Sequence, residues 1–426
     1  MRNLNQKVAI IGGARIPFTK SFGHYSKVSN SDLLAAALNA LVRKYGLEGK
    51  KIDEVILGTL FHYPNAWNWA REIVQSTALD PHTPALFHAR ACGTSLDSAN
   101  TVAMKIAIGQ IENGIAGGSD TNSDMPLSLK RTLAHKLAKL QQSKTTVERT
   151  KNLLKINPFQ FFNLQVPDVR EQRTKLNMGE HTELTVKKWG ITRKEQDELA
   201  YQSHIRAEEA YKDGFYDNLV FPFQGLTKDS IVRPNTTREN LSKLKPAFDK
   251  STSGSLTAGN SSAFTDGATS IFLSSKEYAE RNNLEIESYY IDGQSAAFDY
   301  VGGEDLLLAP TVAVSELLKR NDLSLQDFDF YEIHEAFSGQ LLSTLKAWES
   351  DKFSKEVLGR DRALGSIDRE KLNTRGGSVA IGHPFSATGT RILAGASKIL
   401  KENGGGKCLI SICTGGGMGT ASIIEA

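Results

Sequence analysis

The sequence predicts an α/β protein built from two similar halves, with a further region inserted between them. In the first 125 residues, strand patterns alternate with helical patterns, beginning with Val8–Ile11 and Asp32–Tyr45. This alternation is typical of a sheet with helices on its faces. The pattern Leu47 with Ile52–Leu57 then recurs as Leu323 with Phe328–Ile333, at the same internal spacing. We therefore expect a duplicated fold with a functional site where the halves meet.

The other expected elements fit this scheme. Apolar runs and helical spacing predict further elements in the first half, namely a strand at Asp53–Gly58, helices at Trp67–Thr77 and Thr94–Ile108, and a strand at Asn113–Gly118. In the second half, a helix at Thr311–Arg320 precedes the repeated strand. Gly382–Leu400 and Cys408–Cys413 then parallel Cys92–Ile108 and Ile115–Gly118.

The region between the halves has a different composition. We place the boundaries so that residues 1–125 form the N-terminal half, 126–257 an inserted loop domain and 258–426 the C-terminal half. Leu127–Pro158 holds eight Lys/Arg and one Glu, with leucines at helical intervals, which predicts one or two basic amphipathic helices. Such helices are either a solvated face or a surface that meets a membrane or a partner. Glu195–Asp213 predicts a further helix.

The composition argues against several classes of protein. The net charge of +3 gives no reason to expect nucleic-acid binding. Three cysteines in 426 residues argue against a disulfide framework, and no cysteine or histidine cluster has zinc-ligand spacing. With neither a cleavable presequence nor a membrane-spanning run in the sequence, we expect a cytoplasmic protein without a metal.

Cys92 directly precedes the small-residue helix Thr94–Ile108, in which Ala99, Ala103 and Ala107 recur four residues apart. A helix N-terminus favours a thiolate over a thiol, so Cys92 is expected to have a lowered pKa and to be reactive. The alternative is a buried, inert cysteine. Cys408, in an apolar strand without a motif, is expected in the core.

Three C-terminal stretches favour a reactive Cys92 over an inert one. His334 follows the repeated strand, His383 precedes a helix much as Cys92 does, and Cys413 leads into the glycine turn Gly415–Gly419. Strand ends and helix starts are where α/β proteins build their sites. Glycines let backbone N–H groups approach a reacting atom closely, as an oxyanion hole requires.

These stretches resemble the signatures of the thiolases, in that family's order and spacing. They are Ala91-Cys92-Gly93-Thr94-Ser95, His334-Glu335-Ala336-Phe337, Gly382-His383-Pro384 and Cys413-Thr414-Gly415-Gly416-Gly417-Met418-Gly419, with further matches at Thr257–Ser262 and Asp266-Gly267-Ala268. The resemblance covers essentially the whole chain and implies a five-layered αβαβα core. His334, where many thiolases have asparagine, and the basic insertion are most similar to the thiolase (beta) subunit of fatty-acid-oxidation trifunctional complexes. Gly93, often alanine, and the segment Asn177-Met178-Gly179 depart from the common pattern.

The resemblance implies a 3-ketoacyl-CoA thiolase of fatty-acid β-oxidation. Cys92 would be the nucleophile, because a thiolate attacks a ketone readily at neutral pH. His383 would take its proton, and Cys413 would be the second acid/base. His334 would position a water in one oxyanion hole together with His383, while the backbone N–H groups of Cys92 and Gly415 would form the other.

The resemblance also implies what the protein binds. Coenzyme A would be a substrate rather than a permanently bound cofactor, and the expected contact residues are Ser262, Ala258, Ala336, Phe337 and Met178. A homodimer or larger assembly is expected. The basic stretch Leu127–Pro158 would dock a hydratase/dehydrogenase subunit or a lipid surface, or would instead wall the acyl tunnel.

Three other functions remain to be weighed. A decarboxylating condensing enzyme of the same fold usually lacks a second catalytic cysteine, so Cys413 argues against it. A catalytically silent scaffold would be expected to have lost one of the four side chains, and Cys92, His334, His383 and Cys413 are all in the sequence. An acetyl-CoA acetyltransferase working in the synthetic direction would use the same residues.

Overall fold

The first half of the chain contains the expected alternation of strands and helices. The computed structural model describes residues 6–64 and 66–426. The elements of this half are β1 (Val8–Arg15), β2 (Thr19–Lys20), α1 (Asn30–Lys44), β3 (Glu54–Gly58), α2 (Trp69–Gln75), β4 (Ala85–His88), α3 (Thr94–Ala107), β5 (Asn113–Asp120) and β8 (Thr265–Ser275). The predicted strands and helices are confirmed, with ends that differ by a few residues.

The second half repeats the same succession. Its elements are α9 (Lys276–Arg281), β9 (Ser288–Ala297), α10 (Pro310–Asn321), β10 (Phe330–Ile333), α11 (Ser338–Trp348), α12 (Asp351–Glu356), α13 (Ser378–Ile381), α14 (Thr388–Asn403), β11 (Lys407–Thr414) and β12 (Met418–Glu425). The helix of the predicted Gly382–Leu400 pattern begins later than expected. The segment before it forms the turn that carries His383.

Sheet topology confirms the duplication. The first half has the strand order β1-β8-β5-β3-β4 and the second half β9-β12-β11-β10. In each half the first two pairings are antiparallel and the next is parallel. A parallel bridge between Tyr331 and Leu372 stands where β4 pairs with β3 in the first half. The two sets join through an antiparallel pairing of β1 with β9.

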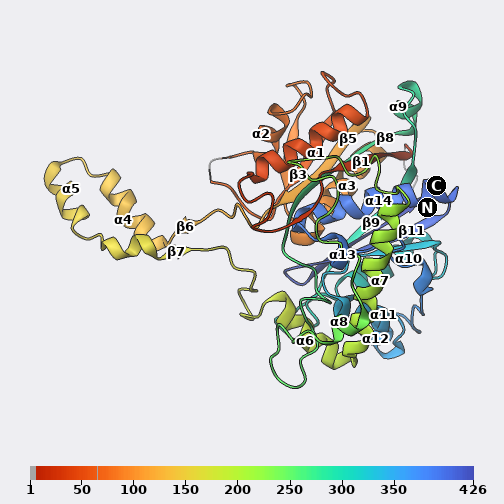
Figure 1. Ribbon diagram of the computed structural model, residues 1–426. Helices are drawn as coiled ribbons and strands as arrows, with labels where there is room; N and C mark the ends of the chain where they lie inside the picture. The colour runs from red at the N-terminus through yellow and green to blue at the C-terminus, as the bar shows by residue number, and fades with distance from the viewer. Residues whose placement is uncertain (1–5, 65) are drawn as a thin grey trace. The chain divides into compact units, whose positions relative to one another are not determined.

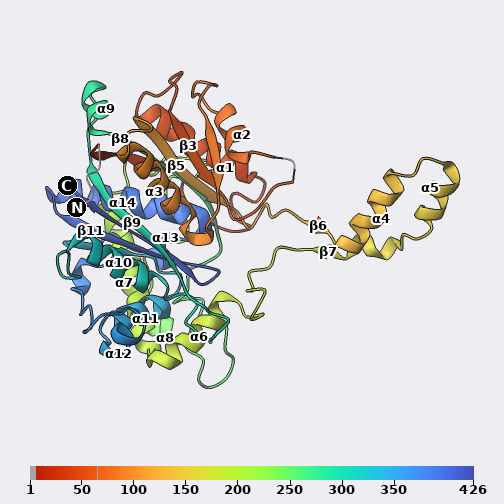
Figure 2. The same ribbon diagram turned by 180° about the vertical axis from the view of Figure 1, so that it is seen from behind.

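Helices cover both sets of strands and also separate them (Figures 1 and 2). Helix α1 packs on β1, β8 and β5, while α10 packs on β9 and β12. Between them, α3 and α14 pack on one another and on strands of both halves. Their contact is close, because a Cβ added at Gly389 would lie 2.1 Å from the backbone N of Leu96. The order helix, strands, helix, strands, helix is the five-layered core that the resemblance implied.

The boundaries of the inserted region differ from those predicted. Met125–Val169, with a short segment after Leu60, forms a compact unit of its own that contains β6 (Ser128–Leu129), α4 (Arg131–Gln141), α5 (Thr146–Leu153) and β7 (Leu164–Gln165). Helices α6 (Met178–Trp189), α7 (Arg193–Lys212) and α8 (Arg238–Ser242) belong to the body instead.

Two physical reasons explain the difference. Helices α6 and α7 pack on α11, and α7 also packs on α13. The polar composition of residues 170–257 therefore reflects helices with one buried face, and these residues are not part of a separate inserted domain. Residues 258–277 belong to the first half, since β8 pairs with β1 and β5. Among the described residues, each helix is too short or too polar to cross a bilayer.

Candidate active site

Cys92 lies in a single 3₁₀ turn, Ala91–Gly93, immediately before α3. Ala91 has a positive φ of 42°, a backbone conformation that non-glycine residues rarely adopt and that clusters at functional sites. A Cβ at Gly93 would lie 2.8 Å from side-chain methyl groups of Thr414 and Thr420. In this chain, glycine therefore lets the Cys92 turn approach the β11–β12 hairpin of the other half.

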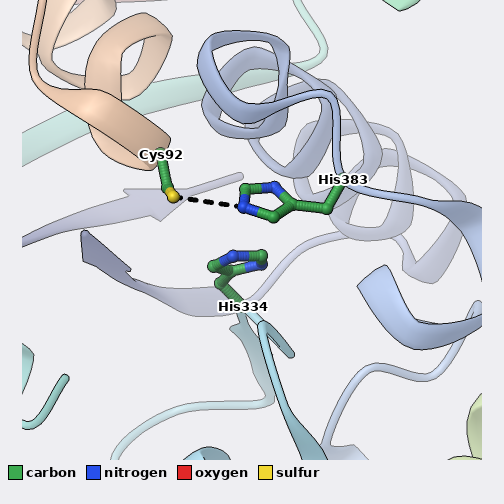
Figure 3. A group of neighbouring side chains, drawn as sticks. All are labelled: Cys92, His334 and His383. Atoms are coloured by element: carbon green, nitrogen blue, oxygen red, sulfur yellow. Dashed lines mark hydrogen bonds between the residues drawn. The ribbon is translucent and has the colours of Figure 1, made fainter. Parts of the chain in front are cut away.

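His383 faces Cys92 from the second half. Its Nε2 lies 3.1 Å from the Cys92 Sγ (Figure 3). Its Nδ1 lies 2.5 Å from the Thr388 Oγ1 at the start of α14. The backbone N–H of His383 donates to the Thr265 Oγ1 at 2.7 Å. For Nε2 to accept the thiol proton, Nδ1 must carry the ring proton and donate to Thr388.

The pKa of Cys92 is raised rather than lowered, which corrects the expectation from its helix-terminal position. The residue keeps a partial opening to solvent, but protein atoms surround most of the thiol. Burial raises the pKa of Cys92 to about 12, although the backbone N–H groups of Gly415 and Cys92 oppose this rise. Burial also lowers the pKa of His383 to about 3, with the positive charge of Arg391 adding to the effect. The resting pair is thus a neutral thiol beside a neutral imidazole that can accept its proton.

His334 lies against His383, with ring centroids 4.2 Å apart. The Cys92 sulfur and one ring nitrogen each of His334 and His383 all lie within 4.8 Å of one another. The His334 Nδ1 is 2.7 Å from the Ser378 Oγ, while its buried Nε2 has no hydrogen-bond partner among the described residues. Burial holds the pKa of His334 well below its usual range, and His383 and Arg391 lower it further. Cys92, His334 and His383 thus come together as expected.

Cys413 is the penultimate residue of β11 (Lys407–Thr414) and lies beside the same site. It is buried, and burial raises its pKa well above the usual range; repulsion from a thiolate on Cys92 adds to this rise. The following turn holds Gly415, whose N–H interacts with the Cys92 sulfur. The structure therefore places both backbone N–H groups of the expected second oxyanion hole at the Cys92 thiol. Cys408, in contrast, is fully buried among apolar side chains in the same strand, as expected.

The expected coenzyme A contacts divide into two groups. Ala336 and Phe337 share an apolar cluster with Cys413, and Met178 packs against it from the start of α6. Ser262 donates its N–H and its hydroxyl to the Ala336 carbonyl, at 3.0 and 2.8 Å. Ala258 is exposed on the same segment as Ser262.

Several polar residues that hold the site were not found by sequence reasoning. The Asp120 carboxylate accepts from the N–H groups of Leu60 and Ser386, so it joins the ends of β5 and β3 to the turn before α14. Burial raises the pKa of Asp120 to about 6. Glu171 accepts from the Gly416 N–H at 2.6 Å and thereby anchors the glycine turn. No motif marks these residues, because their partners are distant in sequence.

Glu335 is a third such residue, and it lies inside a recognised motif. Its carboxylate accepts from Ser203 Oγ, Asn373 Nδ2 and the Val379 N–H, at 2.7, 2.7 and 3.1 Å. A Cβ at Gly377 would lie 2.1 Å from the Glu335 carboxyl carbon, so only glycine allows this close packing. Glu335 thus holds the loop that presents Ser378 to His334.

Together, the fold and the site have the arrangement expected of an enzyme with a cysteine nucleophile and a histidine base, because a thiol, a neutral imidazole and a second buried cysteine lie between two similar halves. Comparison with known proteins agrees with this class. Residues 8–277 match the thiolase N-terminal domain and residues 288–426 the thiolase C-terminal domain. The chain therefore belongs to the thiolase family, a family of acyltransferases, as the sequence predicted.

Individual relatives match over nearly their full length. The chain is 38% identical to a 3-ketoacyl-CoA thiolase of Photobacterium profundum and to one of Vibrio cholerae, with 99% of this chain and 97% of each relative covered. Among solved structures, the acetyl-CoA acetyltransferase of Bacillus anthracis has a TM-score of 0.82 at 30% identity, with both chains fully covered. Human mitochondrial 3-ketoacyl-CoA thiolase in complex with CoA has a TM-score of 0.82 at 27% identity, covering 99% of this chain and 98% of that one.

Proposed function

We propose that this protein is a 3-ketoacyl-CoA thiolase, which transfers an acyl group reversibly between coenzyme A and acetyl-CoA through a thioester on Cys92. The observation that carries the proposal is the 3.1 Å contact of the Cys92 Sγ with the His383 Nε2. The full-length similarity to proteins named 3-ketoacyl-CoA thiolase supports the substrate class.

In the first step, the Cys92 thiol gives its proton to His383 and the sulfur attacks the 3-keto carbon. The carbon–carbon bond then breaks, the acyl group stays on Cys92, and Cys413 protonates the departing acetyl-CoA enolate. In the second step, the coenzyme A thiol returns a proton to Cys413 and attacks the thioester. Cys92 leaves and recovers its proton from His383, so atoms and protons balance. Coenzyme A enters as a substrate, as the human thiolase–CoA complex supports.

The oxyanions of the two steps require different donors. We assign one hole to the N–H groups of Cys92 and Gly415, which already interact with the sulfur. In place of the water that the resemblance implied beside His383, we assign the other hole to His334 and His383 as direct donors, because their rings lie together. Backbone and imidazole donors held in place before the reaction stabilise charge without reorganisation. Met178, Ala336, Phe337, Ser262 and Ala258 are proposed to contact coenzyme A.

The test is thiolysis of 3-ketoacyl-CoA substrates of increasing chain length, with acetyl-CoA and the shortened acyl-CoA measured as products. Iodoacetamide should label Cys92 in preference to Cys408 and Cys413, which are buried, and acetoacetyl-CoA should protect it. A protein that decarboxylates a malonyl thioester instead would be a condensing enzyme. One that carries out neither reaction would be a silent scaffold.

Replacing His334 with alanine is expected to lower turnover roughly 10²–10³-fold, the usual scale for one oxyanion donor. The KM for coenzyme A should change little, since His334 acts at the reacting carbon. Steady-state kinetics with acetoacetyl-CoA measure both constants. An unchanged kcat would remove His334 from the reaction.

We further propose that the unit Met125–Val169 docks the enzyme to an anionic lipid surface. Phe159 and Phe162 are 78% and 87% exposed, and Leu154 and Val147 are also exposed. The adjoining stretch Leu127–Pro158 carries eight Lys/Arg. Exposed apolar side chains beside many positive charges are typical of peripheral membrane contact.

Reversal of charge at Lys130, Arg131, Lys136 and Lys139 to glutamate tests this docking. Co-sedimentation with anionic liposomes should be lost, while thiolysis of short substrates stays at the native rate. The matched control reverses four exposed lysines of the body, Lys51, Lys319, Lys352 and Lys355, and should keep binding. Intact binding with a loss of long-chain activity alone would favour the tunnel-wall alternative. Lost capture of a hydratase/dehydrogenase subunit, with unchanged liposome binding, would identify a protein partner instead.

A further inference from the structure

A short chain of hydrogen bonds reaches His334 from α14. The Arg391 Nη2 donates to the Ser378 Oγ at 2.6 Å, and the Ser378 Oγ lies 2.7 Å from the His334 Nδ1. All three side chains are buried. Arg391 is a donor only, and a serine hydroxyl carries one proton. Since the Ser378 oxygen accepts from Arg391, its own proton is available for the His334 Nδ1.

This arrangement determines which nitrogen of His334 carries the ring proton. A neutral imidazole has one donor nitrogen and one acceptor nitrogen, and the bond made by one sets the state of the other. With Nδ1 accepting from Ser378, the proton lies on Nε2. That nitrogen is buried without a partner among residues 6–64 and 66–426, and its ring packs on His383. An N–H donor therefore remains available beside Cys92 and His383.

The direction of the chain depends on Arg391. If the guanidinium were absent, the Ser378 oxygen could accept from an Nδ1–H instead, which would leave Nε2 as a bare acceptor. A bare nitrogen lone pair facing a developing oxyanion would repel it rather than stabilise it. Beside the guanidinium this arrangement is disfavoured: Arg391 and His334 are the only hydrogen-bond partners of the Ser378 Oγ among the described residues, and Arg391 only donates, so a hydroxyl that accepted from both would leave its own buried proton without an acceptor.

The same helix orients both catalytic histidines. Thr388 and Arg391 are three residues apart in α14 and so lie on neighbouring positions of one face. Thr388 contacts the His383 Nδ1 directly, and Arg391 contacts the His334 Nδ1 through Ser378. The loop that carries Ser378 is held in turn by Glu335, through the Val379 N–H.

We propose that Arg391 and Ser378 are positioning residues that fix His334 as its Nε2–H tautomer, so that it presents a hydrogen-bond donor to the oxyanion hole that it shares with His383. This inference rests on the proposed thiolase function. It assigns the two residues no contact with substrate, and it explains why a histidine can serve where many thiolases have an asparagine amide.

The test is a double-mutant cycle between Ser378 and His334. Ser378→Ala should lower kcat for acetoacetyl-CoA thiolysis about 10–10²-fold, less than the loss expected for His334→Ala, and leave the KM for coenzyme A unchanged. In a His334→Asn background, where the amide needs no tautomer, adding Ser378→Ala should have no further effect on kcat. Equal losses in both backgrounds, or no loss in the native background, would overturn the proposal.

A second pair of variants covers the case in which Ser378→Ala does not fold. Arg391→Met removes the donor at similar length and should behave as Ser378→Ala does, while Arg391→Lys keeps a charged donor and should retain more activity. Nitrogen-15 NMR of labelled histidines should place the His334 proton on Nε2 in the native protein and move it in Arg391→Met. A native proton on Nδ1 would refute the tautomer assignment.

Acylation of Cys92 separates this inference from the proposed function. Each folded variant should still form an acetyl adduct from acetyl-CoA, which mass spectrometry detects. If the native protein forms no adduct and has no thiolase activity, the proposed function fails. If it has both, and kcat does not depend on Ser378 or Arg391, only the positioning role fails.

Discussion

Cys92→Ser is expected to fold normally and to lose on the order of 10⁵-fold or more in thiolysis, the scale seen when a nucleophile is removed from a catalytic set. Serine replaces sulfur by a slightly smaller atom, so the 3₁₀ turn and its contacts should persist. A hydroxyl is far less ionised than a thiol and a weaker nucleophile, so serine cannot replace the sulfur in the attack. Steady-state kinetics and thermal unfolding measure the two expectations.

Intact-protein mass spectrometry locates the acyl group. After mixing with acetyl-CoA, the native chain should gain one acetyl group and Cys92→Ser should gain none. Cys408→Ser is the matched control, because Cys408 is a free cysteine buried in β11 away from the catalytic contacts. It should be acetylated like the native chain. An adduct in Cys92→Ser that maps to Cys413 or Cys408 would refute the assignment of the nucleophile.

The duplicated fold was predictable because the repeat survives in the sequence. The repeated patterns at Ile52–Leu57 and Phe328–Ile333 contain most of β3 and all of β10. These two strands occupy the same place in the two strand orders. Parallel strands buried on both faces require apolar runs, so their signal is strong. That Cys92, His334, His383 and Cys413 lie near one another was predictable for a related reason, since strand ends and helix starts place side chains at fixed positions.

The polar support of the site was not predictable. Arg391 reaches His334 only through Ser378, and Glu171 meets Gly416 across 245 residues of chain. Such contacts depend on tertiary packing and leave no local pattern. The predicted lowering of the Cys92 pKa was wrong for the same reason. A helix N-terminus is a local feature, whereas burial, which raises the thiol pKa, arises from the packing of both halves.

Cys413→Ala is expected to separate the two chemical steps. The variant should still be acylated at Cys92 by an activated thioester, because His383 and the second oxyanion hole remain. Exchange of the α-proton of acetyl-CoA should be lost, since no other group assigned here takes that proton. Turnover should fall about 10³–10⁴-fold, at the upper end for one acid/base, because Cys413 acts once as an acid and once as a base. Deuterium uptake into acetyl-CoA measures the exchange.

Cys408→Ala is the matched control for this loss. Both cysteines lie in β11, and both are buried with a pKa raised above the usual range. Removing either side chain should cost similar packing energy, about 1–2 kcal/mol by lost apolar burial. Only Cys413 adjoins Met178, Ala336 and Phe337 at the proposed coenzyme A contact. Cys408→Ala should therefore lose stability and keep α-proton exchange. If Cys413→Ala exchanges deuterium at the native rate, another group is the base at the α-carbon.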